Sequence, residues 1–113
     1  MSAPDGIPAV PAADVPESDD VLLLDVREQD EWEIGHAPGA LHIPLGELPG
    51  RVDEIDLDRD LYVLCRGGGR SEKAVRYLET VGYEAVLVDG GMIAWASAER
   101  PVVTGDGAVG GVK

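Results

Sequence analysis

The chemistry-bearing stretch of this chain is LCRGGGRSEKA, which holds its only cysteine, Cys65, between two arginines and beside three glycines. The thiolate is the nucleophilic form of cysteine, and neighbouring cations or a helix amino terminus favour it. Gly67, Gly68 and Gly69 lack Cβ atoms, so their backbone amides can turn inward as an anion-binding nest. Arg66 and Arg70 place positive charge on both sides of that nest. The pattern predicts a nucleophilic thiol and an anionic substrate in one loop.

Other interpretations of the same residues fit less well. A nucleotide P-loop requires Gly, four residues and then Gly-Lys-Ser/Thr, and no lysine occupies that place. The spacing of a dinucleotide fingerprint, G-x-G-x-x-G, is also absent. With Cys65, His36 and His42 would supply only three zinc ligands at irregular spacing, so we expect no metal site and no cofactor. A buried cysteine followed by a flexible turn stays open as the non-functional interpretation.

Composition limits the class of protein. The chain has 113 residues, enough for one domain, and carries 22 acidic against 9 basic residues, for a net charge of −13. Such a surface disfavours nucleic acid and anionic membranes. No apolar run approaches the roughly 18 residues of a membrane span, and the amino terminus does not resemble a secretory signal. A single cysteine fits a reducing compartment, so we expect a cytoplasmic protein.

The basic residues are distributed unevenly. Between Cys65 and Arg76 four cations stand against one carboxylate, Glu72, which makes this stretch +3 within an acidic chain. Cations early in a helix oppose the helix dipole. We therefore expect another interaction to hold them there.

Apolar runs and turn residues predict the elements that would position this loop. Nearly continuous apolar runs predict buried parallel strands, and a helical pattern between the last two makes a βαβ unit. In parallel sheets of this kind, ligands bind at the carboxyl edge, where Cys65 would lie. We expect Ser71 to cap the helix and Gly82 to follow its end. The expected strands are 21–25, 61–65 and 85–89, with weaker ones at 7–10 and 40–43; the other expected helices are 48–55, confined to its later residues by Pro49 and Gly50, and 91–99. This makes a three-layer α/β/α domain over residues 7–103, with flexible ends at 1–6 and 104–113.

Three linked motifs, in order from Val21 to Trp95, resemble the rhodanese-like sulfurtransferases. They are LLLDVREQDEWEIGHAPGALHIPL, VLCRGGGRSEKAVRYLETVGY and VLVDGGMIAW. The resemblance implies a five-stranded parallel sheet in the order 1-5-4-2-3. It also implies that Cys65 takes sulfur from a small anionic donor such as thiosulfate, becomes a persulfide, and passes the sulfur to cyanide, a thiol or a protein. The six-residue loop from Cys65 to Arg70 is the length that the family uses for sulfur, whereas its phosphatase and arsenate-reductase relatives have seven.

The resemblance also implies roles for individual residues. Catalysis falls to Cys65, and donor binding to the loop that follows it: Arg66, Gly67, Gly68, Gly69, Arg70 and Ser71. Asp25 and Arg27 would be mainly scaffold at the same sheet edge, and His36 would stabilise a turn. Trp32 and Trp95 are expected in the core. We expect a monomer that needs an external sulfur acceptor, since no second thiol is present. A non-catalytic partner-binding or redox-sensing module is the alternative.

Overall fold

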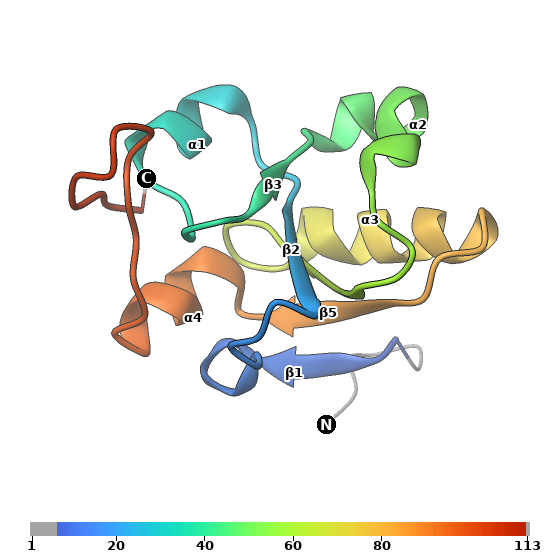
Figure 1. Cartoon of the computed structure of the whole chain (residues 1–113), viewed down its shortest axis with the longest axis horizontal. Helices are drawn as coiled ribbons and strands as arrows, with labels where there is room; N and C mark the ends of the chain where they lie inside the picture. Colours follow the sequence, from blue (N-terminus) through green and yellow to red (C-terminus); the bar gives the residue numbers. More distant parts are fainter. Residues whose placement is uncertain (1–6, 113) are drawn as a thin grey trace.

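A five-stranded parallel sheet forms the centre of the computed structural model, which describes residues 7–112 (Figure 1). The strands are β1 (Ala9–Pro11), β2 (Val21–Asp25), β3 (Leu41–His42), β4 (Asp60–Leu64) and β5 (Ala85–Asp89). Their order in the sheet is β1-β5-β4-β2-β3, and every pairing is parallel. This confirms the predicted order 1-5-4-2-3 and places β4, the strand before Cys65, at the centre.

Alternate residues of the strands enter two separate apolar clusters. Along β4, Leu61 and Val63 enter the cluster that contains helix α3 (Gly69–Thr80), whereas Leu64 enters the one that contains helix α4 (Gly91–Ser97). A strand buried on both faces must be apolar at nearly every position, which is why these runs do not alternate with polar residues. The two helical layers confirm the predicted three-layer α/β/α fold.

Helix α1 (Gln29–Ile34) is an element that the sequence analysis did not predict. It begins with a capping box, in which the Glu28 side chain accepts from the backbone of Glu31 and the Glu31 side chain accepts from the backbone of Glu28. The helix has only six residues and is mostly charged, so it has too little apolar periodicity to be recognised. The Glu-x-x-Glu spacing was the available signal, although the usual capping box begins with Ser or Thr.

The helix expected within 48–55 is present, but its geometry reverses the prediction. Helix α2 (Leu48–Arg51) contains Pro49 and Gly50, and the later residues form a 3-10 turn, η4 (Val52–Glu54). Proline is tolerated here because the first N–H groups of a helix have no intrahelical acceptor. Pro49 therefore fits within the first turn of the helix rather than excluding it. The remaining 3-10 turns are η2 (Ala12–Asp14) and η3 (Leu45–Glu47).

The carboxyl-terminal segment, residues 104–112, lies against α1 and α4 (Figure 1, red). The sequence analysis predicted a flexible end here, outside the domain. Residues 103 and 109 form an antiparallel bridge, and Gly111 donates its amide to the carbonyl of Ile34 at 3.2 Å. A Cβ atom at Gly35 would lie 2.1 Å from the Gly111 carbonyl oxygen, so the two backbones are in close contact. The flexible segment expected at residues 1–6 lies outside the described residues.

No helix between residues 7 and 112 has the length and apolar character required to cross a lipid bilayer.

Candidate active site

Strand β4 ends at Leu64, so Cys65 lies just after the strand and not at its last position, as was predicted. Cys65 is at the carboxyl edge of the sheet. Its side chain faces the α3 side and has 1% of its surface exposed. The Gly68 amide donates to the Cys65 sulfur at 3.0 Å, and the Ser71 hydroxyl oxygen lies 3.4 Å from the same sulfur. A hydrogen bond from an amide is stronger when its acceptor is ionised. The Gly68 amide is therefore placed to donate to whatever negative charge the Cys65 sulfur carries during a reaction.

The loop turns sharply at Gly68, where φ is +133°. A side chain at this backbone conformation would be strained, which explains why glycine stands at this position. The turn places Gly68 at the helix N-cap, so α3 begins at Gly69, earlier than expected. Ser71 is therefore not the N-cap, and that prediction was wrong. Its buried hydroxyl instead lies inside the first turn and donates to the Gly68 carbonyl at 2.9 Å.

The outer side of the glycine loop is open. A Cβ atom added at Gly67, Gly68 or Gly69 would meet no atom within 4 Å. Arg66 is exposed on the same loop. Cys65 thus lies at the base of a loop whose outer face leaves room for a substrate or a partner.

The first residues of α4 form backbone hydrogen bonds with the nucleophile loop. Met92 donates its amide to the Cys65 carbonyl at 2.7 Å, and Ile93 donates to the Arg66 carbonyl at 3.1 Å. Gly91 brings this helix into contact, because a Cβ atom there would lie 2.3 Å from the Cys65 carbonyl oxygen. The Gly-Gly pair before α4 therefore fixes the backbone of the nucleophile loop.

Arg70, expected at the donor site, forms a two-pronged ion pair with Glu31 of α1. Its two terminal nitrogens lie 2.5 and 2.9 Å from the Glu31 carboxylate oxygens. The Arg70 hydrogen bond is the main cause that lowers the pKa of Glu31 to about 2. We expected another interaction to hold the cations at the start of this helix. For Arg70, in the first turn of α3, that interaction is the ion pair with Glu31. Glu31 was not among the predicted site residues, and its partner is 39 positions away in the sequence.

Asp25 and Arg27 form a fully buried ion pair at the same sheet edge, with the Arg27 Nη2 nitrogen 2.8 Å from an Asp25 oxygen. Arg27 also donates to the carbonyl of Gly35 at 2.7 Å and, at 3.4 Å, to that of Glu31. These bonds join the end of β2 to the first turn of α1 and to its C-cap residue. In the structure the pair therefore anchors the helix that carries Glu31.

The rings of His36 and His42 both stack on the ring of Trp32. The ring of Trp32 lies 3.6 Å from that of His36 and 4.7 Å from that of His42, nearly parallel to both. His36 Nδ1 lies 2.9 Å from the Trp32 carbonyl oxygen, and His42 Nε2 lies 2.8 Å from that of Arg27. Trp32 is half-buried in this stack, whereas Trp95 is buried in the α4 cluster. Among residues 7–112, no three His, Cys, Asp or Glu side chains gather as a metal site requires.

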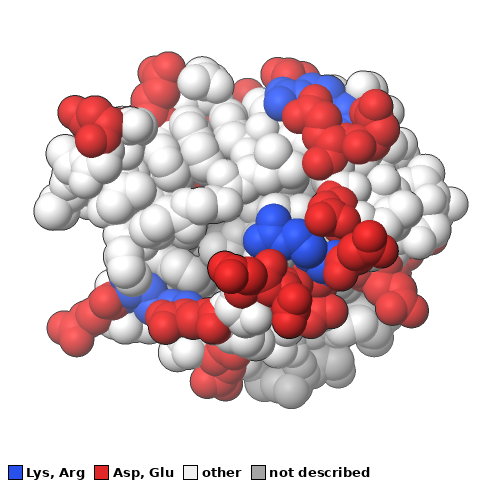
Figure 2. Space-filling view, in the orientation of Figure 1, with Lys and Arg blue, Asp and Glu red and all other residues white. Residues whose placement is uncertain are grey.

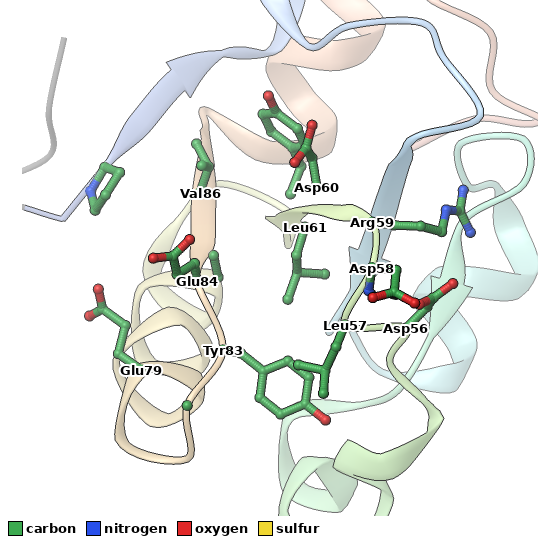
Figure 3. Close-up of a pocket in the computed structure, with 14 residues that line it drawn as sticks. Asp56, Leu57, Asp58, Arg59, Asp60, Leu61, Glu79, Tyr83, Glu84 and Val86 are labelled. Atoms are coloured by element: carbon green, nitrogen blue, oxygen red, sulfur yellow. Dashed lines mark hydrogen bonds between the residues drawn. The ribbon is translucent and has the colours of Figure 1, made fainter.

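One hollow in the surface formed by residues 7–112 lies away from Cys65. It has a volume of about 980 Å³ and lies at the amino ends of β4 and β5, the opposite edge of the sheet. Glu79 and Glu84 lie on one side of it and Asp56 and Asp58 on the other (Figure 3). A second hollow of about 450 Å³ is lined by Trp95, Arg100 and Pro101, among others. Neither of these two hollows is lined by residues of the nucleophile loop.

The fold and the site define a class of protein: a parallel α/β domain with one cysteine in an amide-lined loop at the carboxyl end of its central strand. The sequence model of the rhodanese-like domain matches residues 12–98. The chain therefore belongs to the rhodanese-like domain family.

Similar proteins agree with this assignment. A sulfurtransferase of Allochromatium vinosum is 44% identical over 92 residues, which are 80% of this chain and 86% of that protein. The crystal structure of a rhodanese-related protein from Thermoplasma volcanium is 34% identical, with a TM-score of 0.79, and the match covers 85% of this chain and 97% of that one. A rhodanese-like domain protein from Staphylococcus aureus is 35% identical, with a TM-score of 0.74 and coverage of 79% and 91%. The family and the named relative support sulfur transfer as the general activity.

Proposed function

We propose that this protein is a sulfurtransferase that carries sulfane sulfur on Cys65 as a persulfide. The observation that supports this most directly is the hydrogen bond from the Gly68 amide to the Cys65 sulfur at 3.0 Å, within a loop whose outer side is open. Amides that stabilise a thiolate also stabilise a terminal persulfide anion, because both place negative charge at sulfur. The family assignment supports the same chemistry.

The first half-reaction loads the enzyme. The Cys65 thiolate attacks the outer sulfur of a donor such as thiosulfate, forming a new S–S bond. The S–S bond of the donor breaks, and its electron pair leaves on sulfite. The enzyme then carries a persulfide anion, so atoms and charge balance. Donor atoms would be held by the amides of residues 66–70 and by the hydroxyl of Ser71.

The second half-reaction unloads the enzyme. Cyanide, a thiolate or a protein thiolate attacks the outer persulfide sulfur, and the Cys65 thiolate leaves. Because Cys65 is the only cysteine, no internal thiol can perform this step. The acceptor must come from outside, and the two half-reactions should follow ping-pong kinetics. We place this reaction in a reducing compartment, the cytoplasm, with the protein acting as a monomer.

The intact mass of the reduced protein before and after a brief exposure to thiosulfate tests this function. We expect a gain of one sulfur, about 32 Da, that dithiothreitol removes. The matched control is Cys65→Ser, whose hydroxyl fits the same space but cannot form a persulfide, and which should gain nothing. An equal gain in the control would contradict the role of Cys65.

The same mass measurement distinguishes sulfur transfer from the alternative, a non-catalytic module that binds a partner or senses redox state. If neither thiosulfate, 3-mercaptopyruvate nor cysteine persulfide adds sulfur to the wild type, the sulfurtransferase assignment is wrong. A buried, unreactive Cys65 would then favour a rhodanese-like domain that binds a partner without catalysis.

A further inference from the structure

Arg70 is one of the arginines expected to bind an anionic donor, but Glu31 of the same protein already compensates its charge. Both terminal nitrogens of its guanidinium contact the two Glu31 oxygens, at 2.5 and 2.9 Å. This is the forked geometry in which arginine binds planar oxyanions most tightly. An oxyanion from a donor could use that fork only after displacing Glu31.

Glu31 is held in place by contacts other than Arg70. One of its carboxylate oxygens accepts the Glu28 backbone amide at 3.1 Å, as part of the capping box of α1. Its side chain is only 11% exposed, whereas that of Arg70 is 32% exposed. The helix itself is anchored through Arg27. Glu31 is therefore a fixed partner and not a mobile surface carboxylate.

The immediate electrostatic surroundings of Arg70 contain further charges. Its pKa is raised mainly by the hydrogen bond with Glu31, with smaller contributions from the charges of Cys65 and Glu28. The guanidinium thus lies within electrostatic range of the reactive sulfur, together with two carboxylates. Arg70, Glu28 and Glu31 together carry a charge of −1, so this group of side chains offers no net positive charge to a dianion such as thiosulfate.

The rest of the loop admits a larger donor. The outer faces of Gly67, Gly68 and Gly69 are free of neighbouring atoms within 4 Å. The organic group of a larger donor can therefore lie along this side of the loop while its outer sulfur approaches Cys65. The amides still provide hydrogen bonds for the transferred sulfur.

From these observations we infer that the sulfur donor is an organic persulfide, R–S–SH, and that the Glu31–Arg70 pair selects against small oxyanion donors. This inference rests on the proposed sulfur transfer at Cys65. The Cys65 thiolate attacks the outer sulfur of R–S–SH, and a new S–S bond forms. The donor S–S bond breaks, R–S⁻ leaves with the electron pair, and the enzyme carries Cys65–S–SH. The step needs no oxidant or reductant.

The test compares the second-order rates at which thiosulfate and cysteine persulfide load Cys65, measured by rapid quenching and intact mass. Cysteine persulfide is a suitable probe because the sulfur that it transfers is not part of an oxyanion. We expect the wild type to load at least about 10 times faster from cysteine persulfide. Glu31→Gln should raise the ratio of the thiosulfate rate to the persulfide rate at least about fivefold. Glutamine can preserve the capping box, since Gln serves as well as Glu at that position.

Glu33→Gln is the matched control. It removes one carboxylate from the same helix, but Glu33 is exposed and accepts a hydrogen bond from the side-chain amide of Gln29. This control separates the contact with Arg70 from a general loss of negative charge. An equal rise in the ratio for Glu31→Gln and Glu33→Gln, or no rise for Glu31→Gln, would overturn the inference. Because the two variants meet the same two donors, the intrinsic reactivity of each donor cancels.

The salt dependence of the wild type gives a second measurement that does not depend on any variant folding. A compensated Arg70 predicts that added salt does not slow thiosulfate loading: the rate should fall by less than about twofold between 20 and 200 mM KCl, and any repulsion by the carboxylates would make it rise. A steep fall with salt would show an uncompensated cation attracting thiosulfate and would overturn the inference. Efficient loading from thiosulfate, equal to or faster than that from cysteine persulfide, would overturn the inference while sustaining sulfur transfer. Loading from neither donor would overturn both proposals.

Discussion

At the scale of single residues, a fully buried ion pair, Asp25–Arg27, lies at the carboxyl edge of the sheet. The side chains of Asp25 and Arg27 have no exposed surface, and their oxygens and nitrogens meet at 2.8 to 3.1 Å. Taking two charges out of water costs several kcal/mol per ion, and close contact with additional hydrogen bonds offsets that cost. Arg27 has such bonds to two carbonyls of the α1 region. The pair therefore holds α1, and with it Glu31, beside the nucleophile loop.

We expect Asp25→Asn to destabilise the protein by about 3–5 kcal/mol, because it leaves the Arg27 guanidinium buried without a counter-charge. The measurement is the free energy of unfolding from urea denaturation. Asp89→Asn is the matched control, since Asp89 also ends a strand of the same sheet but is exposed. It should change the free energy by no more than about 0.5 kcal/mol. Similar values for the two variants would contradict the structural role of the pair.

At the scale of secondary-structure elements, the nucleophile loop depends on the close approach of α4 to the end of β4. Gly91 has φ of +56° and its missing Cβ leaves room for the carbonyls of Cys65 and Arg66. The following amides of α4 donate to those two carbonyls. The backbone of the loop is therefore set by an element more than 20 residues away in the sequence.

Gly91→Ala should cost about 3 kcal/mol or more, because a strained backbone and an overlap with two carbonyls combine. It should also slow the loading of Cys65 at least tenfold, since the loop must move to admit the methyl group. Urea denaturation and the mass-based loading rate measure the two effects. Gly46→Ala is the control: its Cβ would meet nothing within 4 Å, and the variant should behave as the wild type within about 1 kcal/mol. Wild-type loading by Gly91→Ala would show that α4 does not set the loop.

The elements also show how far the sequence predicts this fold. The three long strands were recognisable because burial on both faces requires nearly continuous apolar residues, and β2 and β5 match their predicted ranges. Helix α1 was missed, since six mostly charged residues carry no apolar period. The start of α3 was misplaced, because the backbone turns at Gly68 rather than at the residue with the better capping side chain.

The candidate site was predictable to a different degree. Cys65 lies close to its glycines in the sequence, so a nucleophilic thiol beside an anion-binding loop could be predicted from that stretch alone. The contact between Glu31 and Arg70 joins residues 39 positions apart and depends on the Arg27 anchor, which no local pattern encodes. The donor-binding roles assigned to Arg66, Arg70 and Ser71 stay predictions, as do the partners.

At the scale of the whole molecule, negative charge dominates the surface. The net charge is −13, and on the face shown in Figure 2 the visible lysine and arginine side chains lie against aspartates and glutamates. Arg51, for example, contacts both Glu47 and Glu54. Exposed pairs of this kind contribute little to stability, about 0–1 kcal/mol each. The unpaired excess of carboxylates should therefore have the larger effect on the folded state.

Added salt should accordingly stabilise this protein. The molecule measures 36 × 30 × 26 Å, so at about 10 mM salt, where the Debye length is about 30 Å, carboxylates on opposite faces repel one another. At about 150 mM salt the Debye length falls to about 8 Å, and only close neighbours interact. Unfolding separates the charges, so this self-repulsion weighs most on the compact state. We expect the melting temperature at pH 7 to rise by several degrees between 10 and 150 mM NaCl, as measured by circular dichroism. The control is the same pair of scans near pH 4.2, the isoelectric point of the sequence, where the rise should largely vanish. A fall in the melting temperature at pH 7 would show instead that the ion pairs outweigh the repulsion, and that the acidic surface is balanced by its few arginines.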